Sequence, residues 1–79
     1  MGDGLSVQER VGLRVKELRN TAGYSQEQLA LEAGVDRTYI NSVENGRRNI
    51  SINTLSKILT GLDLSLRDFF NCDSFRGER

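Results

Sequence analysis

The residues best suited to recognition chemistry lie between positions 37 and 45 of this 79-residue chain. Ile40 and Val43 stand three residues apart, as on one face of a helix. At about 100° per residue, the remaining faces of this helix carry polar, uncharged side chains. These are Thr38, Tyr39, Asn41, Ser42 and Asn45. They donate and accept hydrogen bonds, and Arg37 adds a planar fork that pairs with the O6 and N7 edge of guanine.

An alternative interpretation of this polar face is a solvated surface without a partner. In a chain with 28% charged residues, however, a merely solvated helix would normally show Lys and Glu there. The neutral hydrogen-bonding groups therefore favour a surface that reads a bound partner.

The composition excludes several other kinds of chemistry. With no His and a single Cys, Cys72, the chain cannot build a zinc site of four Cys or His ligands, a disulfide or a Cys–His nucleophile pair. Scattered carboxylates such as Glu27 and Glu32 are interpreted as helix surface. We therefore expect no enzyme activity, no metal and no cofactor.

The hydropathy pattern and the start of the chain bear on its location. No apolar run approaches the ~20 residues of a membrane span, the first residues do not resemble a signal peptide, and one unpaired Cys suits a reducing compartment. These features predict a cytoplasmic protein without a membrane partner.

The charge balance by itself argues against a nucleic-acid partner, because eleven basic and eleven acidic residues give a net charge of zero. The charges are unevenly placed, however. Residues 10–57 hold eight basic and five acidic groups, and the excess of acid lies at the two ends. Base collects on the first predicted helix, at Arg37 and at the pair Arg47 and Arg48. We expect weak non-specific affinity, with specific contacts carrying most of the discrimination.

The elements that must position these residues are predicted to be helices. Apolar spacings of three and four, with no proline, predict an all-α chain with one domain, 1–79. The expected helices cover about residues 6–22, 26–33, 37–45, 52–60 and 66–71, followed by a polar tail at 72–79. Val7 and Ala22 are expected at the ends of the first apolar stripe, and Ile52 on the inner face of the fourth helix.

Helix ends follow from capping residues. Ser25 is predicted to cap the second helix in a capping box with Gln28, and Asp36 to cap the third. Ser51 and Ser65 are expected to cap the last two helices, while the helices at 6–22, 26–33, 37–45 and 52–60 should end at Gly23, Gly34, Gly46 and Gly61.

The two short helices at 26–33 and 37–45 are joined by little more than Gly34 and Val35, which is the outline of a helix-turn-helix. Over residues 13–70, and above all in the stretches 13–19, 23–30 and 34–46, the chain resembles the Xre/Cro-type helix-turn-helix family of phage and plasmid regulators. Within that family, the segment 36–51 is similar to the controller proteins of restriction-modification systems.

The resemblance implies a compact five-helix, lambda-repressor-like DNA-binding domain. The implied base contacts are Arg37, Thr38, Tyr39, Asn41 and Ser42. The implied contacts to the DNA backbone are Gln26, Asn45, Arg47, Arg48 and Asn49. For Gln26 and Arg48 an ordinary solvated role remains an alternative, and Tyr39 either rests over sugar-phosphate or packs partly against the helix at 26–33.

Two further sets of residues are interpreted structurally. Arg19 and Glu44 lie on or beside apolar faces, where an unpaired charge is costly, and the resemblance implies a salt bridge between them. Large apolar residues gather near the end of the chain, where some should complete the core and the rest should form a two-fold interface. These are Leu62, Leu64, Leu66, Phe69 and Phe70.

These observations predict a sequence-specific transcription regulator whose partner is double-stranded DNA. As a homodimer it would place two reading helices about 34 Å apart on a palindromic operator, activating and repressing a restriction-modification operon, with RNA polymerase as a further partner. The alternative is an antitoxin or protein-interaction module of the same fold.

Overall fold

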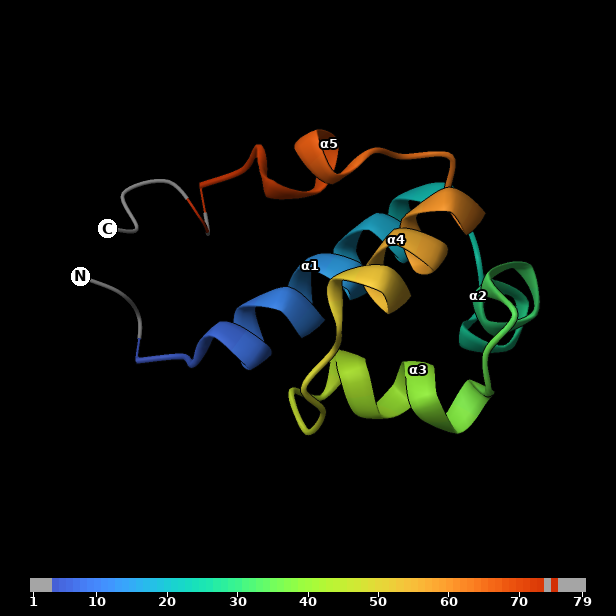
Figure 1. The fold of residues 1–79 in the computed structure, drawn as a ribbon, viewed down its shortest axis with the longest axis horizontal. Coiled ribbons are helices and arrows are strands. Elements are labelled where there is room, and N and C mark those ends of the chain that lie inside the picture. Colours follow the sequence, from blue (N-terminus) through green and yellow to red (C-terminus); the bar gives the residue numbers. More distant parts are fainter. Residues whose placement is uncertain (1–3, 74, 76–79) are drawn as a thin grey trace.

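The computed structural model describes residues 4–73 and 75, and this part of the chain consists of helices and connecting turns without a strand. The helices are α1 (Val7–Ala22), α2 (Gln26–Ala33), α3 (Arg37–Glu44), α4 (Ile52–Gly61) and α5 (Leu66–Phe70) (Figure 1). The all-α class is confirmed, and each helix end lies within one residue of its predicted position. None of these helices has the length and apolar character needed to cross a bilayer.

Serine side chains begin four of the five helices, as local hydrogen bonding favours. Ser25 and Ser51 accept from the backbone amides of Gln28 and Thr54, both at 3.0 Å. Ser65 does the same for α5, and Ser6 forms an unpredicted capping box with Glu9. At Ser25 only this half of the expected box forms among the described residues.

Asp36 is the N-cap residue of α3, but the prediction that its side chain accepts a hydrogen bond from the helix amides is wrong. The amide of Tyr39, which such a cap would engage, donates instead to the backbone carbonyl of Asp36 at 3.0 Å. The carboxylate is therefore left at the surface.

The end of α4 also differs from the prediction. Gly61 is the last helical residue rather than the stop, and Asp63 takes the left-handed conformation with φ 60°. A Cβ on Gly61 would lie 3.2 Å from the Cβ of Glu32. The glycine therefore serves the close approach of α4 to α2.

The core is apolar and draws on every helix. The residues Val15, Leu29, Ile40, Ile58 and Phe69 are fully buried. Val7 and Ile52, predicted to face inward, are each 61% exposed, and Ala22 is exposed as well. All three occupy the first or last position of a helix, where fewer neighbouring helices cover the side chain.

An unpredicted contact at Gly12 sets the distance between α1 and α3. A Cβ at this position would lie 2.1 Å from the carbonyl oxygen of Val43 and 3.0 Å from that of Glu44. Only a residue without a side chain lets the end of α3 lie directly on α1.

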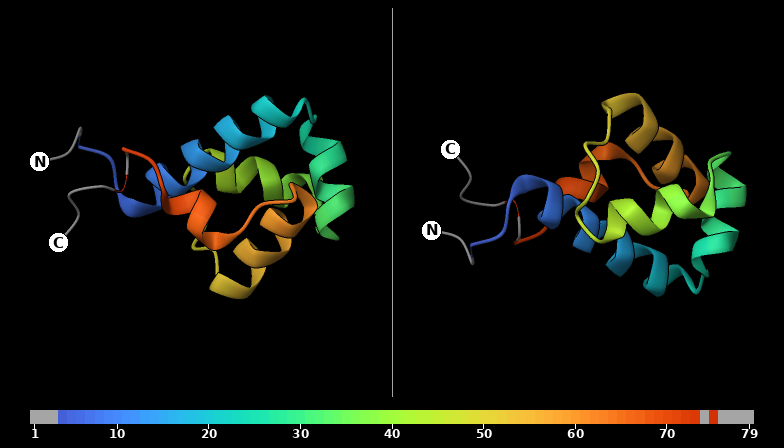
Figure 2. Two further views of the ribbon diagram at one scale, coloured as in Figure 1. Left: turned by 90° about the horizontal axis from the view of Figure 1, so that it is seen from above. Right: turned by 90° about the horizontal axis from the view of Figure 1, so that it is seen from below.

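The last helix packs on the side of the bundle opposite α3 (Figures 1 and 2). Arg14 of α1 holds it by donating to the carbonyl oxygens of Phe69 and Asp68, at 2.8 and 2.9 Å. Phe75 lies in the predicted polar tail yet packs against Phe69 and Phe70, with ring centroids 5.8 and 4.9 Å apart. In the described part of the chain, α5 and Phe75 thus lie away from the outer face of α3.

Candidate nucleic-acid interface

A short turn joins α2 to α3 and leaves the length of α3 at the surface (Figure 2). The turn reverses at Gly34, whose φ of 71° is left-handed, and Val35 donates back to the carbonyl of Ala30 at 2.9 Å. Ile40 and Val43 then face the core, fixing the rotation of α3.

That rotation presents most of the predicted base-contact residues to solvent. Arg37, Thr38 and Asn41 are exposed. Asn41 lies one turn beyond the adjacent pair Arg37 and Thr38, on the same side of the helix. Tyr39 and Ser42 are half-buried, and Tyr39 packs partly against the core. The structure therefore brings together three long or forked polar groups at the outer surface and sets the other two at its edge.

A buried ion pair locks α3 to α1. The Nε of Arg19 donates to the Oε2 of Glu44 at 2.6 Å, and its terminal nitrogen Nη2 donates to Oε1 at 3.1 Å. The third nitrogen of Arg19 donates to the carbonyl of Tyr24 at 2.7 Å. The two residues are 9% and 6% exposed, so the charges are compensated by each other rather than by water. The structure thus contains the pair that the family resemblance implied.

The same carboxylate reaches the start of α2. Gln26 donates from its amide nitrogen to the Oε1 of Glu44 at 3.0 Å, and its amide oxygen accepts from Asn41 at 3.3 Å. A primary amide carries two N–H groups, so one remains to donate to a phosphate at the N-terminus of α2. Gln26 is half-buried and its side chain makes two hydrogen bonds, so the alternative of an ordinary solvated residue does not describe it.

The segment after α3 carries the remaining predicted backbone contacts. The side-chain amide nitrogen of Asn45 donates a hydrogen bond to the backbone carbonyl of Asn41 at 2.8 Å, which satisfies an acceptor at the end of α3. Arg47, Arg48 and Asn49 follow, all exposed.

The sequence suggested that the basic residues of α1 add to the positive charge near α3, but not all of them do. Arg19 is buried against Glu44, and Arg14 is turned toward α5 and pairs with Glu17 at 2.9 Å. The exposed positive charge beside the outer face of α3 comes from Arg37, Arg47 and Arg48.

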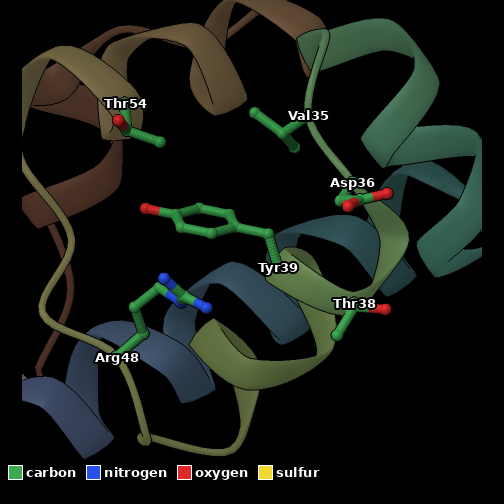
Figure 3. Close-up of a pocket in the computed structure, with 6 residues that line it drawn as sticks. All are labelled: Val35, Asp36, Thr38, Tyr39, Arg48 and Thr54. Carbon is green, nitrogen blue, oxygen red and sulfur yellow. The ribbon is translucent and has the colours of Figure 1, made fainter.

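A shallow hollow of about 300 Å³ lies between α3, the segment after it and the start of α4 (Figure 3). Its lining residues are Val35, Asp36, Thr38, Tyr39, Arg48 and Thr54. The guanidinium carbon of Arg48 stands 4.7 Å from the centre of the Tyr39 ring. No spacing in the sequence predicts this contact, because it depends on how the segment after α3 folds back.

Comparison with known proteins places this geometry in a family. Residues 15–69 match the model of a helix-turn-helix family. The chain belongs to this helix-turn-helix family. α2 and α3 are its two characteristic helices, and the resemblance drawn from the sequence is confirmed.

Similar proteins include control proteins. The control protein C.MunI of Mycoplasma sp is 43% identical over 63 residues, which cover 78% of this chain and 85% of that protein. The control protein C.BamHI of Bacillus amyloliquefaciens is 36% identical over 61 residues, covering 76% and 75%.

Solved structures show the same helix-turn-helix fold. The restriction-modification controller protein C.AhdI from Aeromonas hydrophila superposes with a TM-score of 0.77 at 43% identity, over 80% of this chain and 96% of that one. The controller C.Esp1396I, solved as a tetramer with its natural 35 base-pair operator, gives 0.78 at 37% identity, over 84% and 88%. The expectation of a controller-like fold is confirmed.

The proposed dimer residues of this helix-turn-helix protein separate into two groups. Leu62 and Phe69 are 8% and 0% exposed, so they belong to the part of the set that completes the core of the same chain and are not interface residues. Leu64 is half-buried against that core. Leu66 and Phe70 remain 38% and 40% exposed and are the members of the set with apolar surface to offer.

Proposed function

We propose that this protein is a sequence-specific transcription regulator that binds a palindromic operator as a homodimer and controls a restriction-modification operon. The observation that carries the proposal is the outer face of α3. It presents Arg37, Thr38 and Asn41 on a helix held rigidly by α1 and α2. The solved relative C.Esp1396I, in complex with its operator, supports this use of the fold.

In the proposed complex, α3 enters the major groove and its N-terminal residues reach base edges. Arg37 pairs bidentately with a guanine, and Thr38 and Asn41 offer donors and acceptors to neighbouring bases. Tyr39 and Ser42, at the edge of this surface, complete the proposed contacts to bases.

Contacts to phosphates hold the helix in register without reading sequence. Gln26 would donate its second amide N–H to a phosphate at the N-terminus of α2. On the other side of α3, the contacts would come from Asn45, Arg47, Arg48 and Asn49. The geometry therefore predicts phosphate contacts on both sides of the reading helix.

Leu66 and Phe70 on α5 are the proposed centre of the two-fold interface, because they are apolar, exposed and far from α3. A two-fold axis there would present two copies of α3 to half-sites about one DNA turn apart, ~34 Å. Occupancy of adjacent operators would then allow both activation, through contact with RNA polymerase, and repression. Regulation of this kind requires no enzyme activity.

Selection of bound duplexes from a random-sequence pool tests the proposal. We expect enrichment of a roughly palindromic site. On the selected site at fixed salt, Arg37→Ala should lose about 1–3 kcal/mol and relax preference at one position of each half-site. Gln26→Ala should weaken binding evenly across sequences.

Lys16→Ala is the charge-matched control, since Lys16 is exposed on α1 outside the helix-turn-helix. It should bind like the parent. A pool without enrichment would refute the proposal and favour a protein-interaction module.

A further inference from the structure

The contact between Tyr39 and Arg48 joins a residue of the reading helix to the segment that follows it. The guanidinium carbon of Arg48 lies 4.7 Å from the ring centre, within the range of a cation–π interaction. Figure 3 shows Arg48 on one side of the ring and Thr54 of α4 on the other. The Tyr39 ring thus lies between Thr54 and the guanidinium group of Arg48.

The two partners differ in how firmly they are held. Tyr39 is half-buried, packs against the core and donates its backbone amide to Asp36 within the first turn of α3. Arg48 is exposed and lies outside any helix. A long arginine side chain has many rotamers, so the ring is the fixed element and Arg48 is the element it orders.

Arg48 differs from Arg14 and Arg19 in how its positive charge is compensated. Arg14 and Arg19 each pair with a carboxylate at less than 3 Å, whereas in the described part of the chain no carboxylate pairs with Arg48. Asp36, which lines the same hollow, lies on the far side of Tyr39 from Arg48 (Figure 3). The positive charge is thus available to an external anion.

A guanidinium group can use two surfaces at once. Its flat face stacks on an aromatic ring, while its edge keeps the N–H groups that match a phosphate. A cation that is already oriented loses less entropy when it binds, which raises affinity.

We infer that Tyr39 and Arg48 form one preorganised phosphate-binding unit, in which the ring holds the guanidinium plane so that its N–H edge meets a single phosphate of the operator. This inference rests on the proposed function and adds a positioning role for Tyr39. The unit places one of the few exposed cations of a neutral chain where the DNA backbone passes.

A double-mutant cycle tests the unit, with fluorescence anisotropy on the selected operator and on a scrambled duplex of equal length. Arg48→Lys keeps the charge but loses the plane, and Tyr39→Leu loses the ring. We expect each change alone to weaken binding by at least about two- to fivefold, the factor that an exposed cation–π contact provides. In the Arg48→Lys background, Tyr39→Leu should weaken binding less than it does in the parent protein, by that same factor. This coupling should be the same on both duplexes.

Tyr39→Phe is the matched control, because it keeps the ring and removes only the hydroxyl. A cycle between Tyr39→Phe and Arg48→Lys should show no coupling. Independent, multiplicative effects in the cycle with Tyr39→Leu would overturn the inference.

A second measurement does not depend on whether Tyr39→Leu folds. In the free parent protein, the side-chain methylene protons of Arg48 should show upfield NMR shifts from the ring, retained when operator is added. Random-coil shifts in either state would overturn the inference. A parent protein that binds neither duplex would instead refute the proposed function, so the two failures are distinguishable.

Discussion

Removing the carboxylate of Glu44 is expected to destabilise the whole domain. Glu44 accepts two hydrogen bonds from Arg19 and one from Gln26. In Glu44→Ala, Arg19 would remain buried and would keep its hydrogen bond to the carbonyl of Tyr24. Breaking a buried pair in this way costs about 3–5 kcal/mol, because one charge is left uncompensated.

The lower end of that range applies to Glu44→Ala, because Arg19 has 9% of its surface exposed to solvent and keeps one hydrogen bond. A loss of about 3 kcal/mol is large for a small domain, whose total stability is about 5–15 kcal/mol. At about 4–8 °C per kcal/mol for a chain of this size, Tm should fall by about 12–24 °C.

Thermal and urea unfolding followed by circular dichroism measure this effect. Glu27→Ala is the matched control, because Glu27 is an exposed acid in the first turn of α2, and it should change stability by less than about 0.5 kcal/mol. The double variant Arg19→Met with Glu44→Leu should recover much of the loss, since both charges are then gone. If Glu44→Ala melted within about 2 °C of the parent, the reasoning about the buried pair would be refuted.

Three further outcomes are expected. Gly12→Ala should destabilise the fold by about 3 kcal/mol or more, because its Cβ would lie 2.1 Å from the backbone oxygen of Val43; a Tm equal to that of the parent would contradict the packing of α1 on α3. Phe70→Ser should convert a dimer to a monomer in sedimentation velocity, while Leu31→Ser, a matched change at a residue 80% exposed on α2, should not; equal behaviour of the two would exclude α5 as the interface. Hydrogen bonds from the backbone and side chain of Ser65 lower the pKa of the Asp68 carboxyl, so its contribution to stability is present at neutral pH and lost as the pH falls below about 4. The Tm difference between the parent and Asp68→Asn should therefore shrink in acid, and a difference that stays constant would contradict this.

What the sequence predicts well is local. Ser25, Ser51 and Ser65 cap helices as expected, and Gly34 takes the left-handed turn that joins α2 to α3. These outcomes depend on residues three or four positions apart. Asp36 stands at the N-cap of α3 without a side-chain hydrogen bond, and the amide of Tyr39 donates to its backbone carbonyl; residue type alone does not reveal this outcome.

What the sequence misses is tertiary. Arg14 reaches the carbonyls of α5 across more than fifty residues, and Gln26 meets Glu44 across eighteen. No periodicity reports such pairs. The Arg19–Glu44 pair came from the family resemblance, which carries information about the folded arrangement that spacing lacks.

Apolar content alone also fails to separate core from interface near the end of the chain. Leu66 and Phe69 lie three residues apart on a helix of five, yet one is 38% exposed and the other fully buried. The difference arises where α5 meets the rest of the bundle, and Arg14 fixes that position by holding the carbonyl of Phe69. Which hydrophobic residue remains for a partner therefore depends on an arginine on another helix.

The zero net charge of the chain does not describe its surface, because some charged side chains are paired inside the fold. Two arginines of α1 are taken up inside the fold, one by Glu44 and one by α5, so they stabilise the bundle rather than attract DNA. Glu44 in turn orders Gln26 through a hydrogen bond, so one carboxylate both secures α3 and positions a proposed phosphate contact. With net charge zero, long-range attraction is weak and affinity must come from groups already in place. Rigid placement of a few exposed polar and basic side chains is therefore what makes a neutral chain suited to reading DNA.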